Sequence, residues 1–186
     1  MASEMATPVV VEARADTDRG GKYLTFRLGD EEYGVEILKV KEIIGLLPIT
    51  PVPRTPEFIR GVLNLRGKII PVLDLRQKFG MGRAEDTEFT CIVVVDTAVR
   101  GNSALMGVLV DTVSEVVDVP EADIEDAPRF GDAIDTTFIL GMAKHKSSVK
   151  ILLDIEAVLA EQGVVEIAAM TEQDLARLTA GDMREE

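Results

Sequence analysis

The sequence has few aromatic residues, one cysteine and one histidine, and these scarcities exclude several classes of protein. With Cys91 and His145 alone, the chain cannot form an intrachain disulfide or assemble a zinc site from His and Cys ligands. Aromatic residues make up 4% of the chain and tryptophan is absent, which argues against the aromatic platforms of a glycosidase. A packed interior must therefore consist mainly of Val, Ile and Leu, and the β-branched members of that set favour strands.

Basic charge and long apolar runs are lacking as well. The net charge of -13 provides no basic field for nucleic acid or an anionic membrane. No apolar run approaches the roughly 20 residues of a membrane-spanning helix, and residues 1–20 do not resemble a signal peptide. We therefore expect no nucleic-acid partner, no membrane insertion and a cytoplasmic location.

The motifs of common enzymes are incomplete. Residues 61–68 look like a phosphate-binding loop, but five residues separate Gly61 from Gly67, and Ile69 stands where Ser or Thr must reach the metal. Residues 16–27 begin like a calcium loop but lack its closing glutamate. We predict no catalytic residue, no metal and no cofactor. A small hydrolase using the carboxylates of residues 30–32 or 123–126 is the alternative, and it lacks a convergent His, Cys or Gly-rich site.

What the sequence does contain is an apolar segment, residues 61–75, interrupted by one charge. Residues 69–73 do not alternate between apolar and polar, so this strand is expected to be buried on both faces. Asn64, Arg66 and Gly67 break the run as a turn between two strands would. The segment therefore predicts a hairpin that holds Arg66 at the edge of a core.

Two blocks of the sequence recur in the same order. Phe58, Ile59, Gly61, Leu73 and Asp74 meet identical residues at a shift of 80 positions, which are Phe138, Ile139, Gly141, Leu153 and Asp154. Gly34, Val35, Val40 and Glu42 likewise meet Gly107, Val108, Val113 and Glu115 at a shift of 73. This pattern indicates an internal duplication.

Short runs of strand-forming residues bounded by turn residues predict many short strands with brief helical turns, which is typical of a mostly β fold built as barrels or a sandwich. Residues 1–20 are expected to form a flexible tail. Short helices are predicted near residues 56–59, 75–79, 138–141 and 154–162, and Cys91 is predicted to be a small core residue. A further helix signal at residues 171–183 leaves two interpretations open, a docking helix or a frayed tail.

Glu42 and Arg66 stand out because each lies among apolar neighbours. The planar guanidinium of Arg66 matches a carboxylate, so a Glu42–Arg66 pair would satisfy both charges, and the sequence leaves open whether the two side chains pair. Two interpretations stay open: the pair only fixes the fold, or Arg66 lies at a partner-binding surface and Glu42 orients it. Val40, Ile43 and Val108 pose the same question, because they suit either the core or an apolar groove for another protein.

The motifs at residues 28–35, 37–43, 56–64, 64–76, 107–111 and 153–155 together resemble the CheW family, the coupling proteins of bacterial chemotaxis. The resemblance covers roughly residues 21–163, with repeats at about 21–88 and 89–163, and leaves residues 164–186 as a tail with a short helix. It implies a mostly β fold of two intertwined five-stranded SH3-like barrels related by pseudo-symmetry.

The resemblance also implies a non-catalytic adaptor between the cytoplasmic tip of a methyl-accepting chemoreceptor and the regulatory domain of the histidine kinase CheA, recruited to membrane-bound receptor arrays. Carried over by motif, the receptor-facing residues are Val40, Glu42, Ile43, Arg66 and Val108, and Gly61 with its surroundings supports the kinase interface. Within the family, an adaptor for surface motility or another non-flagellar output stays open. A fragment of a kinase or of a fused receiver protein is disfavoured, because no receiver-like acidic pocket is visible.

Overall fold

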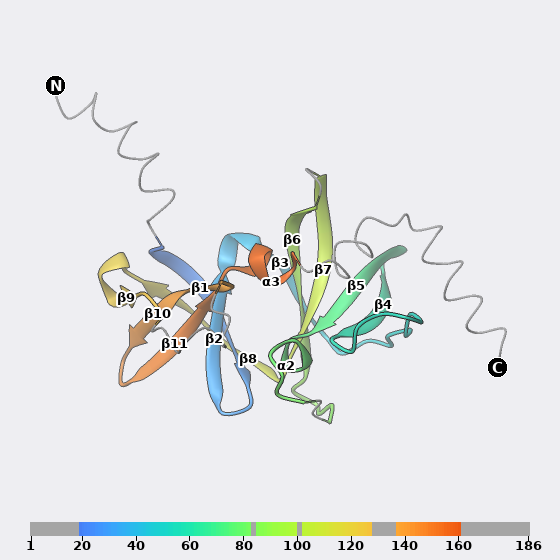
Figure 1. Ribbon diagram of the computed structural model, residues 1–186, viewed down its shortest axis with the longest axis horizontal. Helices are drawn as coiled ribbons and strands as arrows, with labels where there is room; N and C mark the ends of the chain where they lie inside the picture. Colours follow the sequence, from blue (N-terminus) through green and yellow to red (C-terminus); the bar gives the residue numbers. More distant parts are fainter. Residues whose placement is uncertain (1–18, 83–84, 100–101, 128–136, 161–186) are drawn as a thin grey trace, which may run out of the picture.

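The computed structural model describes residues 19–82, 85–99, 102–127 and 137–160 (Figure 1). Most of the predicted N-terminal tail and the predicted C-terminal helix lie outside these residues. Within them the chain forms short strands joined by turns and one-turn helices. In chain order these are β1 (Gly21–Leu28), β2 (Glu31–Glu36), η1 (Ile37–Lys39), β3 (Val40–Gly45), β4 (Ile59–Leu65), β5 (Lys68–Asp74), α2 (Leu75–Lys78), β6 (Cys91–Val99), β7 (Asn102–Val110), β8 (Thr112–Val119), η2 (Glu121–Asp123), β9 (Ile124–Glu125), β10 (Ile139–His145), β11 (Ser148–Leu153) and α3 (Ile155–Val158).

The strands form two sheets that lie side by side along the long axis of the molecule (Figure 1). Sheet A has the order β8-β1-β2-β11-β10-β9, and sheet B has the order β3-β6-β7-β5-β4. When the two-residue strand β9 is set aside, both sheets have five strands in the same arrangement. This agrees with the predicted pair of SH3-like barrels.

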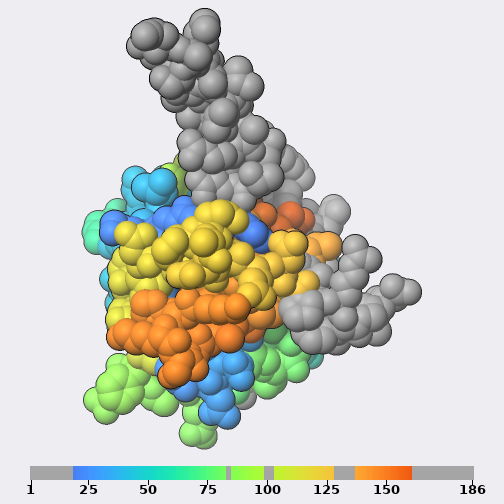
Figure 2. Space-filling view, turned by 90° about the vertical axis from the view of Figure 1, so that its left-hand side faces the viewer, coloured from blue at the N-terminus to red at the C-terminus, as the bar shows by residue number. Residues whose placement is uncertain are grey.

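The strand pairing agrees with the internal duplication and shows how the repeats are interwoven. Gly34 lies opposite Leu152 where β2 runs parallel to β11, and Gly107 lies opposite Val72 where β7 runs parallel to β5. These two pairs are related by the shifts of 73 and 80. Each parallel contact joins a strand of one repeat to a strand of the other, so the split near residue 88 divides the sequence repeats and not the sheets. Figure 2 shows the outer end of sheet A, largely covered by the second repeat in yellow and orange.

Three apolar clusters form the core. The buried residues of one cluster, among them Leu63, Ile70 and Ile92, all come from sheet B and lie inside the barrel that this sheet forms. A second lies inside sheet A around Tyr23 and Leu152. The largest draws residues from both sheets and therefore lies between them. Residues 70–73 of β5 are buried on both side-chain parities, which confirms the prediction for this strand.

Several local predictions need correction. The short helices predicted at residues 56–59 and 138–141 are turns that lead into β4 and β10. β6 and β7 form a long hairpin in which Val99 and Asn102 still pair. Cys91 is only partly buried. The helical turns after β5 and β11 are confirmed, each with an aspartate at its N-cap.

Candidate functional site

Glu42 and Arg66 form an ion pair, a contact that the sequence left open. The guanidinium binds the carboxylate through two hydrogen bonds, from Nη1 to Oε2 at 2.6 Å and from Nη2 to Oε1 at 2.7 Å. The pair joins β3 to the β4–β5 turn, which belong to the two edges of sheet B. Because Arg66 donates to it, the pKa of Glu42 is held below its ordinary value, and the carboxylate is ionised at neutral pH. The Arg66 side chain is 70% exposed, so the pair lies at the surface and is available to a partner.

The β4–β5 turn fixes the position of Arg66. Arg66 and Gly67 both have positive φ, 54° and 87°, as in a two-residue hairpin turn whose backbone twist matches its strands. The Asn64 side chain accepts a hydrogen bond from the Gly67 amide at 2.7 Å. Lys146 occupies the equivalent place in the β10–β11 turn and also has a positive φ of 58°. An arginine in this backbone region is uncommon, and here the conformation aims the side chain at Glu42.

The apolar residues predicted for the same surface divide into exposed and buried members. Ile43 on β3 is 42% exposed, whereas Val108 on β7 is 2% exposed. Ile43 is paired with Val93, and Val93 with Val108, so the three form one row across sheet B. Val40 is half-buried against the core between the sheets. Val108 therefore cannot touch a partner directly, and Val93 separates it from Ile43 in this row.

Gly61 is buried at a place where no side chain fits. It has a φ of 145°, and a Cβ atom added there would lie 2.1 Å from the Thr50 carbonyl oxygen. Thr50 and Val62 exchange backbone hydrogen bonds of 2.8 and 2.9 Å at this point. The glycine thus allows the connector between β3 and β4 to lie directly on β4.

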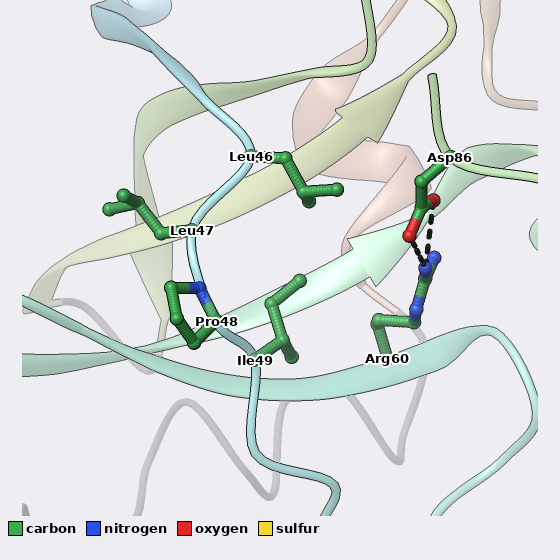
Figure 3. A pocket seen from close by; sticks show the side chains of 6 residues that line it. All are labelled: Leu46, Leu47, Pro48, Ile49, Arg60 and Asp86. Atoms are coloured by element: carbon green, nitrogen blue, oxygen red, sulfur yellow. Dashed lines mark hydrogen bonds and ion pairs between the residues drawn. The ribbon is translucent and has the colours of Figure 1, made fainter. Parts of the chain in front are cut away.

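The same connector borders a groove of about 450 Å³ beside Gly61. Leu46 and Ile49 point toward Arg60 and Asp86, while Leu47 points away (Figure 3). Arg60 Nη2 donates to both carboxylate oxygens of Asp86 at 2.9 and 2.7 Å. The groove is lined by leucine, proline and isoleucine on one side and by this ion pair on the other, a combination suited to another protein's surface.

Comparison with known proteins identifies the family. A family described as CheW-like domain matches residues 22–163. The chain belongs to the CheW family. It is 38% identical over 158 residues to the chemotaxis protein CheW of Klebsiella aerogenes, an alignment that covers 85% of this chain and 93% of that protein.

Further relatives support the CheW assignment. The Rhizobium meliloti CheW is 33% identical, with 78% of this chain and 92% of that protein covered. Protein FrzA of Myxococcus xanthus is 39% identical over 112 residues, with 60% of this chain and 68% of that protein covered. The crystal structure of the scaffolding protein TtCheW from Thermoanaerobacter tengcongensis has a TM-score of 0.68 and 38% identity, covering 77% of this chain and 95% of that chain.

The structure also reveals exposed apolar residues that the sequence reasoning missed. Val116 on β8 is 50% exposed and stands at the position equivalent to Ile43 by the shift of 73. The repeat itself was therefore the signal that could have found it. Leu46, Leu47 and Phe89 are also exposed, but no sequence pattern distinguishes them from core residues. In the described part of the chain, no helix is both long and apolar enough to cross a membrane.

Proposed function

We propose that this chain is a non-catalytic chemotaxis adaptor that couples the cytoplasmic tip of a chemoreceptor to the regulatory domain of the kinase CheA. Membership of the CheW family and the absence of a catalytic motif in the sequence support this assignment. The observation that carries it is a pair of separate protein-binding features on sheet B, one at Arg66 and one at the groove beside Gly61.

The receptor surface is the exposed side of β3 with the neighbouring turn. Ile43 supplies apolar area, and the Glu42–Arg66 pair supplies an oriented guanidinium beside it. Such a combination suits the mixed apolar and polar face of a helical receptor tip. Val40 and Val108 belong to this surface as supports, because both pack into the core between the sheets.

The kinase surface is the groove beside Gly61. Its apolar wall is part of the connector, whose position depends on the close approach of Thr50 to Gly61. The CheA regulatory domain resembles CheW, so two similar folds meet at this surface. Separate surfaces allow both partners to bind at once, and the adaptor then biases the kinase only by its different affinity for the two kinase states.

Both surfaces are tested by measuring how tightly the purified protein binds a receptor cytoplasmic fragment and the CheA regulatory domain from the same cell. We expect Arg66→Asn to weaken receptor binding at least about tenfold and to leave kinase binding unchanged. Asparagine tolerates the positive φ of the turn, so the fold is kept. Lys146→Asn makes the same change in the other hairpin and is the matched control.

The kinase arm uses Leu46→Glu, which places a charge in the groove, with Val149→Glu at the exposed start of β11 as its control. We expect only Leu46→Glu to reduce kinase binding. Equal effects of Arg66→Asn and Lys146→Asn would refute the receptor surface. Binding of the unmodified protein to neither cognate partner would overturn the proposed function. Repeating these binding assays with receptors and kinases from a flagellar and from a non-flagellar system of the same cell identifies which of the two systems the protein serves.

A further inference from the structure

The two sheets differ in one buried pair of residues at equivalent positions. In sheet A, Lys150 on β11 stands opposite Glu32 on β2, and its Nζ donates to Glu32 Oε1 at 2.5 Å. Lys150 is 3% exposed, so a charged amine lies inside the sheet. Ser114 adds a further side-chain hydrogen bond to the Glu32 carboxylate. This contact lies within the parallel pairing that joins the first repeat to the second.

The equivalent pair in sheet B is apolar. The shifts of 80 and 73 carry Lys150 to Ile70 and Glu32 to Leu105. The parallel pairing of β5 with β7 begins with Val72 opposite Gly107, and extending this register by two residues places Ile70 opposite Leu105. Both side chains belong to the apolar cluster inside sheet B. One parallel contact therefore has an ion pair where the other has two alkyl side chains.

This difference matters because the repeats are similar enough to offer a second pairing. If each repeat paired its own strands, β2 would lie beside β5 and β7 beside β11. The same register would then place Glu32 opposite Ile70, and Lys150 opposite Leu105. The buried amine of Lys150 and the partly buried carboxylate of Glu32 would then face alkyl groups without a counter-ion, which is unfavourable, above all for Lys150. In the observed pairing each charge has a counter-charge, and the two alkyl side chains pack in an apolar cluster.

We infer that Glu32 and Lys150, together with Leu105 and Ile70, determine which strands pair, and that they enforce the intertwined monomer. The same four residues disfavour monomers in which β2 lies beside β5, and dimers in which β2 of one copy lies beside β5 of the other, since both arrangements contain the same mismatches. In coiled coils a single buried polar residue selects the register and the number of helices, and the Glu32–Lys150 pair has the corresponding role between the strands here. If both parallel contacts held alkyl pairs, these positions would no longer favour one strand pairing over the other.

The test is refolding from denaturant over a range of protein concentrations. The variants are Glu32→Leu with Lys150→Ile, which copies the apolar pair of sheet B, and Glu32→Lys with Lys150→Glu, which reverses the charges but keeps the pair. Light scattering after size separation gives the monomer fraction. Amide–amide nuclear Overhauser contacts distinguish β2 beside β11 from β2 beside β5. We expect the charge-reversed protein to match the unmodified protein.

We expect the apolar double variant to give a second species with β2 beside β5, either within a monomer or between the two copies of a dimer whose share grows with protein concentration. A clean return of this variant to the original monomer would overturn the inference. So would mixed species from the charge-reversed protein. Glu32→Gln with Lys150→Met provides a second neutral pair, nearer in shape to the original. If neither neutral pair gives any ordered form, the ion pair is needed for folding as such, and the inference fails.

Discussion

At the scale of single residues, the backbone position of a glycine decides its importance more than its place in a motif. Gly61 and Gly67 lie on the same hairpin and both have positive φ. A Cβ at Gly61 would collide with the Thr50 carbonyl, whereas a Cβ at Gly67 would meet nothing within 4 Å. Gly61 therefore carries both a conformational and a steric requirement, and Gly67 carries only the first.

We expect Gly61→Ala to lower the free energy of unfolding by roughly 2–4 kcal/mol, because the connector must move away from β4. Gly67→Ala is expected to lower it by about 1 kcal/mol, the usual penalty of a non-glycine residue at positive φ. Denaturant titrations of the two variants give both values. Equal losses would show that the contact with Thr50 has no energetic weight. Kinase binding should fall for Gly61→Ala and remain for Gly67→Ala.

At the scale of elements, the two one-turn helices are held by their caps and not by their length. A four-residue helix has too few internal hydrogen bonds to be stable alone. Asp74 accepts hydrogen bonds from the amides of Arg76 and Gln77 at 3.0 and 3.4 Å. Asp154 accepts one from Ala157 at 3.3 Å. Asp74 also accepts a hydrogen bond from Arg60 Nη1 at 3.4 Å, and Arg60 lines the groove. The same carboxylate therefore caps α2 and contacts a residue of the groove.

We expect Asp154→Ala to lower the free energy of unfolding by about 1 kcal/mol, the typical value of an N-cap. Asp74→Ala is expected to lower it by roughly 3 kcal/mol, because it also removes a carboxylate from the nearly buried Arg60. Asp74→Asn keeps a good cap but removes the charge, so it separates the two contributions. The prediction is wrong if the two alanine variants unfold at the same denaturant concentration.

At the scale of the whole molecule, stability depends on a charged group inside sheet A. The hydrogen bond from Lys150 holds the pKa of Glu32 below its ordinary value. A lowered carboxylate pKa stabilises the fold above the unfolded value of about 4.3. This contribution is lost as the pH falls from there through the lowered folded value, because the native state must then take up a proton that the unfolded state already carries.

We expect the free energy of unfolding to fall on acidification below about pH 4.3, and to fall less steeply when Glu32→Leu and Lys150→Ile are combined. Denaturant titrations between about pH 7 and pH 3 measure the two profiles. Glu42→Gln removes a carboxylate whose pKa is lowered by an exposed ion pair, so it should change the dependence of stability on pH less. Identical profiles for the unmodified protein and the double variant would contradict the role of Glu32.

The sequence by itself determined the local structure and much of the candidate site. The unbroken apolar run of residues 69–73 identified a strand buried on both faces. The break at Asn64, Arg66 and Gly67 identified the hairpin turn, and the repeated blocks identified the duplication. Glu42 and Arg66 stood out in the sequence as charges among apolar neighbours, but only the structure showed that they pair. These features depend on side-chain periodicity and turn chemistry, which act over a few residues.

Only the tertiary structure decided which strands of the two repeats pair and which apolar residues reach the surface. Val108 and Ile43 have the same chemical character, but Val108 is in the middle of sheet B and Ile43 is on its edge strand. The groove unites Leu46 with Arg60 and Asp86, which are distant in sequence. Because the repeats are similar, more than one pairing of their strands is possible. Which pairing forms depends on packing between strands that are distant in sequence and on the pairing of the buried Lys150 with Glu32.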